Sequence, residues 1–261
     1  MTKKHDIIWI DRVDSTNDEA RRQISRLDNL SVLSAVEQTG GRGQRGNSWL
    51  SQPGLNLTFS IMLKFGQKPM HEFRAADQFA ISQIASLSAI DLLSAYDIKA
   101  HIKWPNDIYA DNRKICGMLI ENSVRDGMLS SSIIGIGLNV NQTDFAPSLP
   151  NPISMALFNA RKDGDSHELY SVDRLLEEFM DIFKGYYGRY LNISGGLARL
   201  RKLYLAQLWK MNEPATYIDT ASGTKFNGII RGISGIGLLQ VEDTDKGELK
   251  EFAFKEISFC I

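Results

Sequence analysis

Residues 40–63 read GGRGQRGNSWLSQPGLNLTFSIML, and the order of the parts within this stretch separates two fold classes. The glycines at 41, 43 and 46 match the G-x-G-x-x-G string of dinucleotide-binding folds. In those folds a helix begins at the glycines, so that its N-terminus meets the pyrophosphate. Here a Pro53-Gly54 turn follows, and apolar and polar residues then alternate over 55–63, which predicts a half-buried strand. The glycine-rich segment is therefore predicted to be a flexible loop between two strands, and the Rossmann fold is excluded.

The segments on both sides of this loop predict an α+β fold with a mixed, largely antiparallel sheet. The expected strands are 7–13, 31–38 and 55–63, followed by a meandering antiparallel sheet over 102–141, and the expected helices are 16–27, 73–96, 172–191 and 197–209. Thr16 is the expected N-cap of the first helix, because Glu19 follows it at the capping-box spacing. The helix over 73–96 is expected to be amphipathic, since its apolar residues recur every three or four positions.

The character of the chain changes after Pro214. Short alternating segments and many glycines replace the helical pattern, as expected of a small barrel of about five strands. We therefore predict a main domain over residues 1–211 and a small β domain over residues 212–261.

Composition and charge narrow the function classes. Of the 261 residues, 43% are hydrophobic and 23% are charged, which indicates an ordinary globular protein. Thirty basic and 31 acidic residues give a net charge of -1, so no basic field argues for nucleic-acid or membrane-surface binding. Two cysteines, Cys116 and Cys260, are too few for a disulfide framework and fit a reducing compartment. The apolar run Ile7–Ile10 is too short for a signal peptide or a membrane span, and we expect a cytoplasmic protein.

The glycine-rich loop carries two positively charged side chains, Arg42 and Arg45. Guanidinium groups and the exposed amides of such a loop suit an anionic ligand such as a phosphate. A solvated surface loop without a ligand is the alternative interpretation.

A second motif, Lys103-Trp104-Pro105-Asn106-Asp107, is followed by Lys114-Ile115-Cys116-Gly117. Pro-Asn-Asp is typical of a tight turn, and Lys114 on its own fits a surface lysine on a strand. Asn106 and Asp107 nevertheless supply the oxygen ligands that magnesium prefers. Asn106, Asp107 and Lys114 are therefore candidates for triphosphate binding.

A third motif, IIGIGLNVN over 133–141, predicts a strand with one aliphatic face and one bare face that carries Gly135 and Gly137. Paired glycines in a strand indicate that a ligand or another backbone approaches closely, or that a helix packs there.

A fourth motif, Asp14-Ser15-Thr16-Asn17, fits a helix start, and its hydroxyls and amides also suit a small polar group.

Taken in order, these motifs resemble those of the biotin-protein ligase family, over most of residues 7–261. The family's Ser-Thr-Asn matches Ser15, Thr16 and Asn17, and its glutamine before the loop matches Gln38. Its Gly-Arg-Gly-Arg-x-Gly matches 41–46, with Trp49 after the loop, and its Lys-Trp-Pro-Asn-Asp is present unchanged at 103–107. Its Lys-x-x-Gly matches Lys114 and Gly117, and its Gly-x-Gly-x-Asn-x-Asn matches 135–141.

The resemblance implies a class II synthetase-like α+β fold with an SH3-like β-barrel at the C-terminus, and a two-step reaction. Biotin and ATP, with Mg²⁺, form biotinyl-5′-AMP and pyrophosphate, and a lysine of a biotin carboxyl carrier protein then takes the biotinyl group. The residues implied in biotin binding are Ser15, Thr16, Asn17, Gln38, Gly41, Arg42, Gly43, Gln44, Lys114, Gly117, Gly135 and Gly137. Those implied in ATP binding are Arg45, Asn47, Trp49, Asn106, Lys114 and Asn139. Lys114, Arg42 and Arg45 are implied in catalysis, and Asn106 and Asp107 in holding the Mg²⁺.

Two loop positions depart from the family's pattern. Gln44 stands where arginine is frequent and Asn47 where a basic residue is frequent, so altered retention of the adenylate is expected. Because the sequence begins at the catalytic domain, we expect a ligase without a DNA-binding domain, acting as a monomer or homodimer. The alternatives are a lipoate- or octanoate-protein ligase, whose usual Arg-Arg-x-x-Gly-Gly-Gly loop is missing, and a non-catalytic biotin or nucleotide sensor, against which the retained Lys114 argues.

The glycine-rich loop is predicted to be mobile without ligand and ordered with biotin or adenylate, because its glycines leave little intrinsic backbone restraint. Limited proteolysis near Arg42 and Arg45 should be slowed when biotin and ATP are both present. Equal cleavage with and without the ligands would contradict the prediction.

Overall fold

The protein is built on a seven-stranded sheet with the strand order β1-β2-β3-β7-β6-β5-β4. The computed structural model describes residues 5–66, 72–163, 169–191 and 193–260, without the side chains of Arg45 and residues 161–163. The strands are β1 (Ile7–Val13), β2 (Val32–Gln38), β3 (Leu57–Lys64), β4 (Ala100–Lys103), β5 (Asp107–Ala110), β6 (Arg113–Arg125) and β7 (Met128–Leu138). Strands β1 and β2 pair in parallel and the other neighbours pair antiparallel, which confirms the mixed, largely antiparallel sheet.

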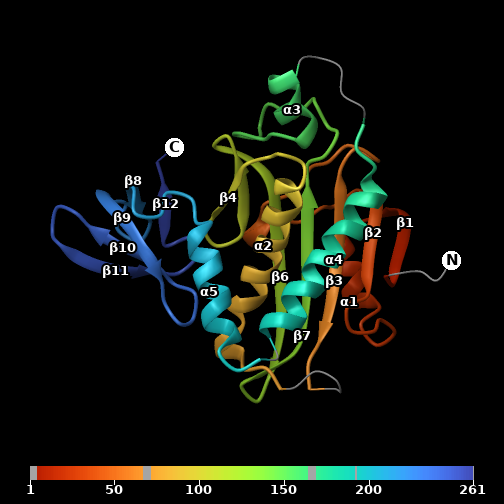
Figure 1. Cartoon of the computed structure of the whole chain (residues 1–261), viewed down its shortest axis with the longest axis horizontal. Coiled ribbons are helices and arrows are strands. Elements are labelled where there is room, and N and C mark those ends of the chain that lie inside the picture. Colours follow the sequence, from red (N-terminus) through yellow and green to blue (C-terminus); the bar gives the residue numbers. More distant parts are fainter. Residues whose placement is uncertain (1–4, 67–71, 164–168, 192, 261) are drawn as a thin grey trace.

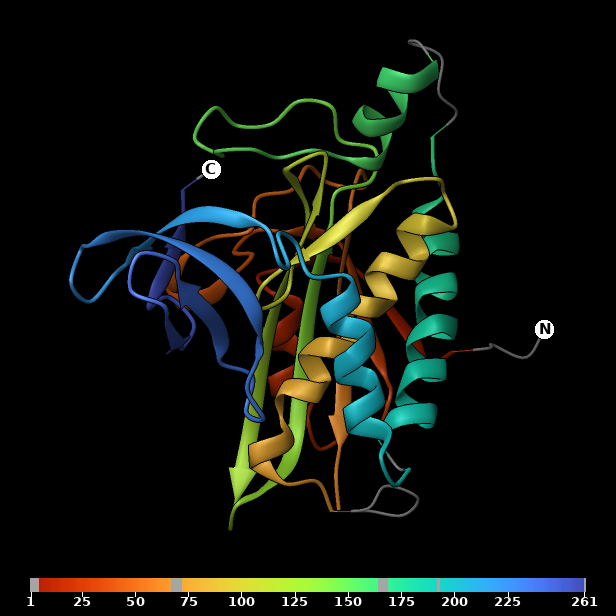
Figure 2. The same ribbon diagram turned by 60° about the vertical axis from the view of Figure 1, so that its left-hand side comes forward.

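Helices cover both faces of this sheet (Figures 1 and 2). One face carries α2 (Phe79–Ser94), α4 (Val172–Tyr190) and α5 (Gly196–Ala206), and the other carries α1 (Thr16–Arg22). A further helix, α3 (Met155–Asp163), and two short 3-10 turns, η1 (Gln44–Gly46) and η2 (Ala75–Asp77), complete the main part. Within the described residues, no helix has the length and apolar character needed to cross a membrane.

Helix α2 and strand β3 differ from the sequence-based expectations, mainly because both are more deeply buried than expected. Helix α2 begins at Phe79, after η2, and thirteen of its sixteen residues are buried, so it is not amphipathic. It packs against β4 and β5 and also against the helices α4 and α5, and small side chains such as Ser86 and Ala89 allow this close packing. Strand β3 is buried on both faces rather than half-buried, because α1 covers its polar face.

The first helix also differs in its ends. Its N-cap is Ser15, whose side chain accepts a hydrogen bond from the Asp18 backbone N–H, and Thr16 is the first helical residue. The helix ends at Arg22 rather than near Leu27. Both Ser and Thr cap helices well, so residue type alone does not decide between two neighbours.

Two tight turns connect the strands β5, β6 and β7. Asp111 and Asn112 have φ angles of 52° and 57°, and Asp126 and Gly127 have φ angles of 52° and 76°. Asn, Asp and Gly tolerate this left-handed backbone, which two-residue hairpins require. The short turns keep β5, β6 and β7 in consecutive antiparallel pairs.

A second, five-stranded antiparallel sheet follows, as expected of a small barrel-like unit, but it is not closed. It contains β8 (Pro214–Asp219), β9 (Lys225–Ile233), β10 (Leu239–Asp243), β11 (Glu248–Phe252) and β12 (Ile257–Phe259), in the order β11-β10-β9-β8-β12. The division of the chain into 1–211 and 212–261 stays a prediction. Both views show this sheet beside α5 (Figures 1 and 2).

Contacts at Trp104 join the second sheet to the first. The indole Nε1 of Trp104 donates a 3.0 Å hydrogen bond to the carbonyl of Gly237, and its ring packs against Phe254. Lys103 lies among the rings of Tyr109 and Phe259, and burial lowers the pKa of its ammonium group. Residues from the C-terminal sheet thus contact the segment that precedes Asn106 and Asp107.

Gly237→Ala is predicted to lower the free energy of unfolding by about 2 kcal/mol or more, since left-handed backbone and core overpacking each cost at least about 1 kcal/mol. Gly237 has a φ of 94°, and a Cβ there would collide with the ring of Phe79. Gly235→Ala is the matched control, because a Cβ at Gly235 meets nothing within 4 Å. Urea unfolding of both variants measures the difference, and equal midpoints would refute the prediction.

Candidate active site

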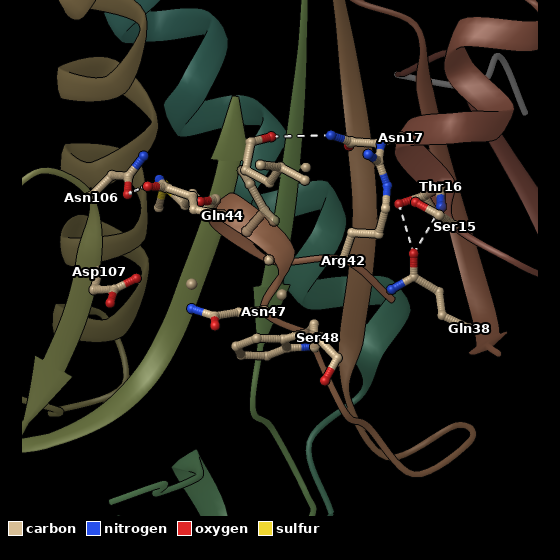
Figure 3. Close-up of a pocket in the computed structure, with 18 of the residues that line it drawn as sticks. Ser15, Thr16, Asn17, Gln38, Arg42, Gln44, Asn47, Ser48, Asn106 and Asp107 are labelled. Atoms are coloured by element: carbon tan, nitrogen blue, oxygen red, sulfur yellow. Dashed lines mark hydrogen bonds between the residues drawn. The ribbon is translucent and has the colours of Figure 1, made fainter. Parts of the chain in front are cut away.

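A pocket lies where the N-terminus of α1, the glycine-rich loop, and strands β6 and β7 meet (Figure 3). Figure 3 shows Ser15, Thr16, Asn17 and Gln38 on one side of it and Asn106 and Asp107 on the other. The lining residues are Ser15, Thr16, Asn17, Gln38, Arg42, Gly43, Gln44, Asn47, Ser48, Trp49, Pro105, Asn106, Asp107, Lys114, Gly117, Met118, Leu119, Gly135, Ile136, Gly137 and Phe254. All four motifs therefore contribute to one cavity.

The register of the sheet builds the floor of this pocket. Ser60, Gly135 and Leu119 form one row across β3, β7 and β6, and Thr58, Gly137 and Gly117 form the next row. Residues opposite each other in antiparallel strands point to the same face. Hydroxyls and glycines thus occupy the face that α1 and the loop cover.

Side chains of the site itself cover the two glycines of β7. A Cβ at Gly135 would collide with the carboxamide of Asn17, and a Cβ at Gly137 would collide with the indole of Trp49. The close approach predicted from the sequence is thus made by side chains from α1 and from the loop, and not by another backbone.

The polar wall of the pocket is ordered by a hydrogen bond from Thr16. Its backbone N–H donates to Gln38 Oε1 over 2.8 Å, and its hydroxyl oxygen lies 3.2 Å from the same oxygen. Thr16 is 3% exposed, so the backbone hydrogen bond replaces a contact with water that burial removes. It holds the Gln38 carboxamide with its oxygen toward α1.

Arg42 of the loop is half-exposed and paired with two carboxylates. Its Nη2 lies 2.8 Å from Asp18 Oδ1 and 3.1 Å from Glu121 Oε2. Arg21 contacts the same two carboxylates. Such exposed ion pairs are each worth at most about 1 kcal/mol, so an anionic ligand can replace them.

Gln44 crosses from the loop to the opposite wall. Its Nε2 donates to Asn106 Oδ1 at 3.1 Å and to the Met118 carbonyl at 3.2 Å. The loop itself is a narrow hairpin, because Gly43 N–H donates to the Asn47 carbonyl and Trp49 N–H to the Gly41 carbonyl. The position that lacks the frequent arginine therefore faces the pocket.

Lys114 of β6 lies beside the turn that carries Asn106 and Asp107. Its Nζ is 2.8 Å from Asp107 Oδ1 and 6.0 Å from the centre of the Trp49 ring. The turn is held from behind by Tyr204, whose hydroxyl donates to the Pro105 carbonyl over 2.7 Å. Lys114 and Asp107 were predicted from the sequence to belong to one site, and in the structure their side chains are in contact.

Two residues implied by the resemblance, Gly41 and Asn139, do not line this pocket. Gly41 lines a neighbouring cavity, and a Cβ there would collide with the Trp49 carbonyl. Asn139 donates to the Ile153 carbonyl and lines an adjoining cavity that shares Asp107 and Lys114. The side chain of Arg45 lies outside the described residues.

The residues of the site that were not predicted from the sequence include Phe254, Ser60 and Glu121. Phe254 reaches the pocket from the segment after β11, and no local pattern connects it with the motifs. Ser60 and Glu121 contact Asn17. The hydroxyls that alternate along β3 were the available signal for Ser60.

Cys116 has no role in this arrangement. It is completely buried beside Lys114, and burial raises the pKa of its thiol. A protonated, buried thiol is a poor nucleophile, so Cys116 acts as a small apolar side chain.

The chain is similar to known proteins in sequence and in fold. Residues 9–139 match the model of the biotin/lipoate A/B protein ligase family. The chain is 30% identical to the biotin--[acetyl-CoA-carboxylase] ligase of Paracoccus denitrificans, over 87% of this chain and 90% of that protein. The chain belongs to the biotin protein ligases of this family.

Two further relatives extend the comparison. The bifunctional ligase/repressor BirA of Escherichia coli is 29% identical over 94% of this chain and 71% of its own length. The biotin protein ligase of Aquifex aeolicus, solved with biotin and ATP, superposes with a TM-score of 0.74 over 98% of this chain and 99% of that chain, at 23% identity. This ligase therefore has the biotin protein ligase fold.

The two sides of the pocket of this ligase differ in chemistry. Hydroxyls and carboxamides, with Arg42 beside them, line the side of α1 and Gln38, whereas Asp107 lies at the opposite side (Figure 3). Lys114 pairs with Asp107 there. The first side suits an uncharged ring with hydrogen-bonding groups, and the second suits phosphate.

Proposed function

We propose that this chain activates biotin with ATP as biotinyl-5′-AMP and transfers the biotinyl group to a lysine of a biotin carboxyl carrier protein. The observation that carries the proposal is the single pocket that joins the Thr16 and Gln38 wall to the Asn106, Asp107 and Lys114 turn. The relative named biotin--[acetyl-CoA-carboxylase] ligase supports the same reaction. We place the reaction in the cytoplasm, because the two cysteines fit a reducing compartment.

In the first step, a carboxylate oxygen of biotin attacks the α-phosphorus of ATP. A new P–O bond forms, and the bond to the pyrophosphate leaving group breaks. Two anions must approach, so fixed cations lower the barrier by neutralising them. Lys114 lies at the turn where both groups would meet, and Arg42 reaches the pocket from the loop.

In the second step, the uncharged amine of the carrier lysine attacks the carbonyl carbon of the mixed anhydride. An amide bond forms, AMP leaves with the bonding electron pair, and the nitrogen loses a proton. No covalent link to the ligase is needed. The loop that carries Arg42 and Gln44 would shield the anhydride from water until the carrier arrives.

Asn106 and Asp107 would hold Mg²⁺ together with the phosphates of ATP. Mg²⁺ is usually bound through one or two carboxylates plus phosphate oxygens and water, and this turn offers one carboxylate and one amide oxygen. No group of three His, Cys, Asp or Glu among the described residues is placed to bind a metal alone. Mg²⁺ would neutralise charge on the leaving pyrophosphate. Asn139, in the adjoining cavity, is assigned to the nucleotide side.

Biotin-dependent exchange of pyrophosphate into ATP by the purified chain tests the proposal. Exchange with biotin, followed by transfer of biotin to a carrier domain, is the expected result. The matched family also contains lipoate ligases, so the assay is repeated with lipoate and octanoate. Exchange only with those acids, or binding of biotin without exchange, would overturn the proposal.

Lys114→Ala is predicted to reduce adenylate formation by about a hundredfold or more, because loss of one positioned donor at a developing anion costs roughly 3 kcal/mol. Folding should survive, since the Lys114 side chain is one-third exposed. Lys99→Ala, at an exposed position of the same charge, is the control. An unchanged exchange rate in Lys114→Ala would exclude Lys114 from the catalytic machinery.

Gln44→Arg is predicted to slow the release of biotinyl-adenylate by roughly ten- to a hundredfold, because a charge-assisted hydrogen bond is worth about 1.5 to 3 kcal/mol. Gln44 contacts Asn106, which is assigned to the nucleotide side, so an arginine there would meet the phosphate. Stopped-flow release from both proteins measures the effect. Equal or faster release from the variant would show that this position does not face the phosphate.

A further inference from the structure

Glu121, from the middle of β6, lies outside every motif and contacts two elements of the site. Its Oε2 accepts a hydrogen bond from Asn17 Nδ2 over 2.8 Å, and Arg42 of the loop donates to both of its oxygens. Arg21 lies 2.6 Å from its Oε1. One carboxylate therefore joins α1, the loop and the sheet.

We propose that Glu121 is a positioning residue that orients the carboxamide of Asn17, and through it the hydrogen-bond donors and acceptors of the biotin-binding wall. The inference rests on the proposed function.

Two acceptors surround the carboxamide nitrogen of Asn17. Its Nδ2 donates to Glu121 Oε2 and to the Leu119 carbonyl, two groups that only accept. Rotating the carboxamide by 180° would turn its oxygen toward both acceptors. Asn17 is 3% exposed, so no water replaces a lost partner. The orientation of Asn17 is therefore determined by Glu121 and Leu119 together.

Hydrogen bonds connect Asn17 through Ser60 to Thr16 in the biotin-binding wall. Ser60 Oγ lies 2.6 Å from Asn17 Oδ1 and 2.7 Å from Thr16 Oγ1. Ser60 has one hydroxyl hydrogen, and Asn17 Oδ1 only accepts, so that hydrogen is used by Asn17. The contact between the two hydroxyls then requires Thr16 as the donor. The bonds thus run in one direction, from Thr16 through Ser60 and Asn17 to Glu121.

The hydrogen-bonding groups of Thr16 and Gln38 determine which ligand the wall can bind. Gln38 Oε1, 3.2 Å from the Thr16 hydroxyl, already accepts from the Thr16 backbone N–H, so the hydroxyl hydrogen is free for the shorter contact with Ser60. Thr16 Oγ1, which lines the pocket, is then left as an acceptor. The Gln38 oxygen is engaged by the Thr16 backbone N–H, so the Gln38 amide nitrogen is the group left to donate. An acceptor beside a donor complements a cyclic urea, which carries N–H next to C=O. A dithiolane ring has neither group, so this arrangement favours biotin over lipoate.

Glu121 and Asp18 share arginine partners but differ in their contact with Asn17. Asp18 pairs with the same two arginines, Arg21 and Arg42, but no hydrogen bond joins its carboxylate to Asn17 among the described contacts. Loss of either acid therefore disturbs the same ion pairs. Only loss of Glu121 releases the Asn17 carboxamide.

The test measures the Kd for biotin by calorimetry, and the KM for ATP in the exchange assay, in four variants. Glu121→Ala is expected to weaken biotin binding about tenfold, the order of one buried hydrogen bond, and to leave the KM for ATP within twofold. Asp18→Ala should leave both values within twofold. The double variant Asn17→Ala/Glu121→Ala should bind biotin as Asn17→Ala alone does, because residues that act through one group are not additive.

Three results would overturn the inference. These are unchanged biotin binding in Glu121→Ala, equal losses in Glu121→Ala and Asp18→Ala, and additive losses in the double variant. If Glu121→Ala does not fold, Glu121→Gln replaces it. Its single acceptor oxygen is shared between Asn17 and the arginines, so at least threefold weaker binding is expected, and unchanged binding refutes the role. Failure of the unmodified chain to bind biotin would instead refute the proposed function.

Discussion

The alternation of side chains along β3 and β7 is the constraint on which both the core and the site depend. On one face, Phe59 and Ile134 belong to the main hydrophobic core. On the other, Ser60 and Gly135 lie under α1, where Asn17 needs the space that a side chain on Gly135 would fill. Because successive strand residues point to opposite faces, a slip of one residue would exchange these roles. The same register therefore stabilises the fold and shapes the pocket.

The two described cations of the pocket are paired with carboxylates before any substrate enters. Arg42 contacts Asp18 and Glu121, and Lys114 contacts Asp107. These partners hold the long side chains near the pocket, which reduces the entropy lost when an anion arrives. Since the pairs are partly exposed, they are weak enough to exchange.

How far the site could be predicted depended on where each residue stands in the chain. Residues in contiguous motifs, such as Thr16 and Lys114, were predicted because local patterns of turns, caps and strands mark them. Glu121 and Phe254 were not, since their roles arise from strand register and from contact with a distant sheet. The expected amphipathic helix over 73–96 was wrong for a related reason. Its burial comes from α4 and α5, about a hundred residues later in the chain.

The hydrogen bond from Trp104 to the Gly237 carbonyl ties the turn at 104–107 to a strand connection that is synthesised much later. During translation, β1 to β7 leave the ribosome well before Gly237 does. The pocket thus lacks one of its supports, and the Phe254 wall, until residues 237–254 have been synthesised. A nascent chain or a truncated product that ends before this segment therefore cannot hold the complete site.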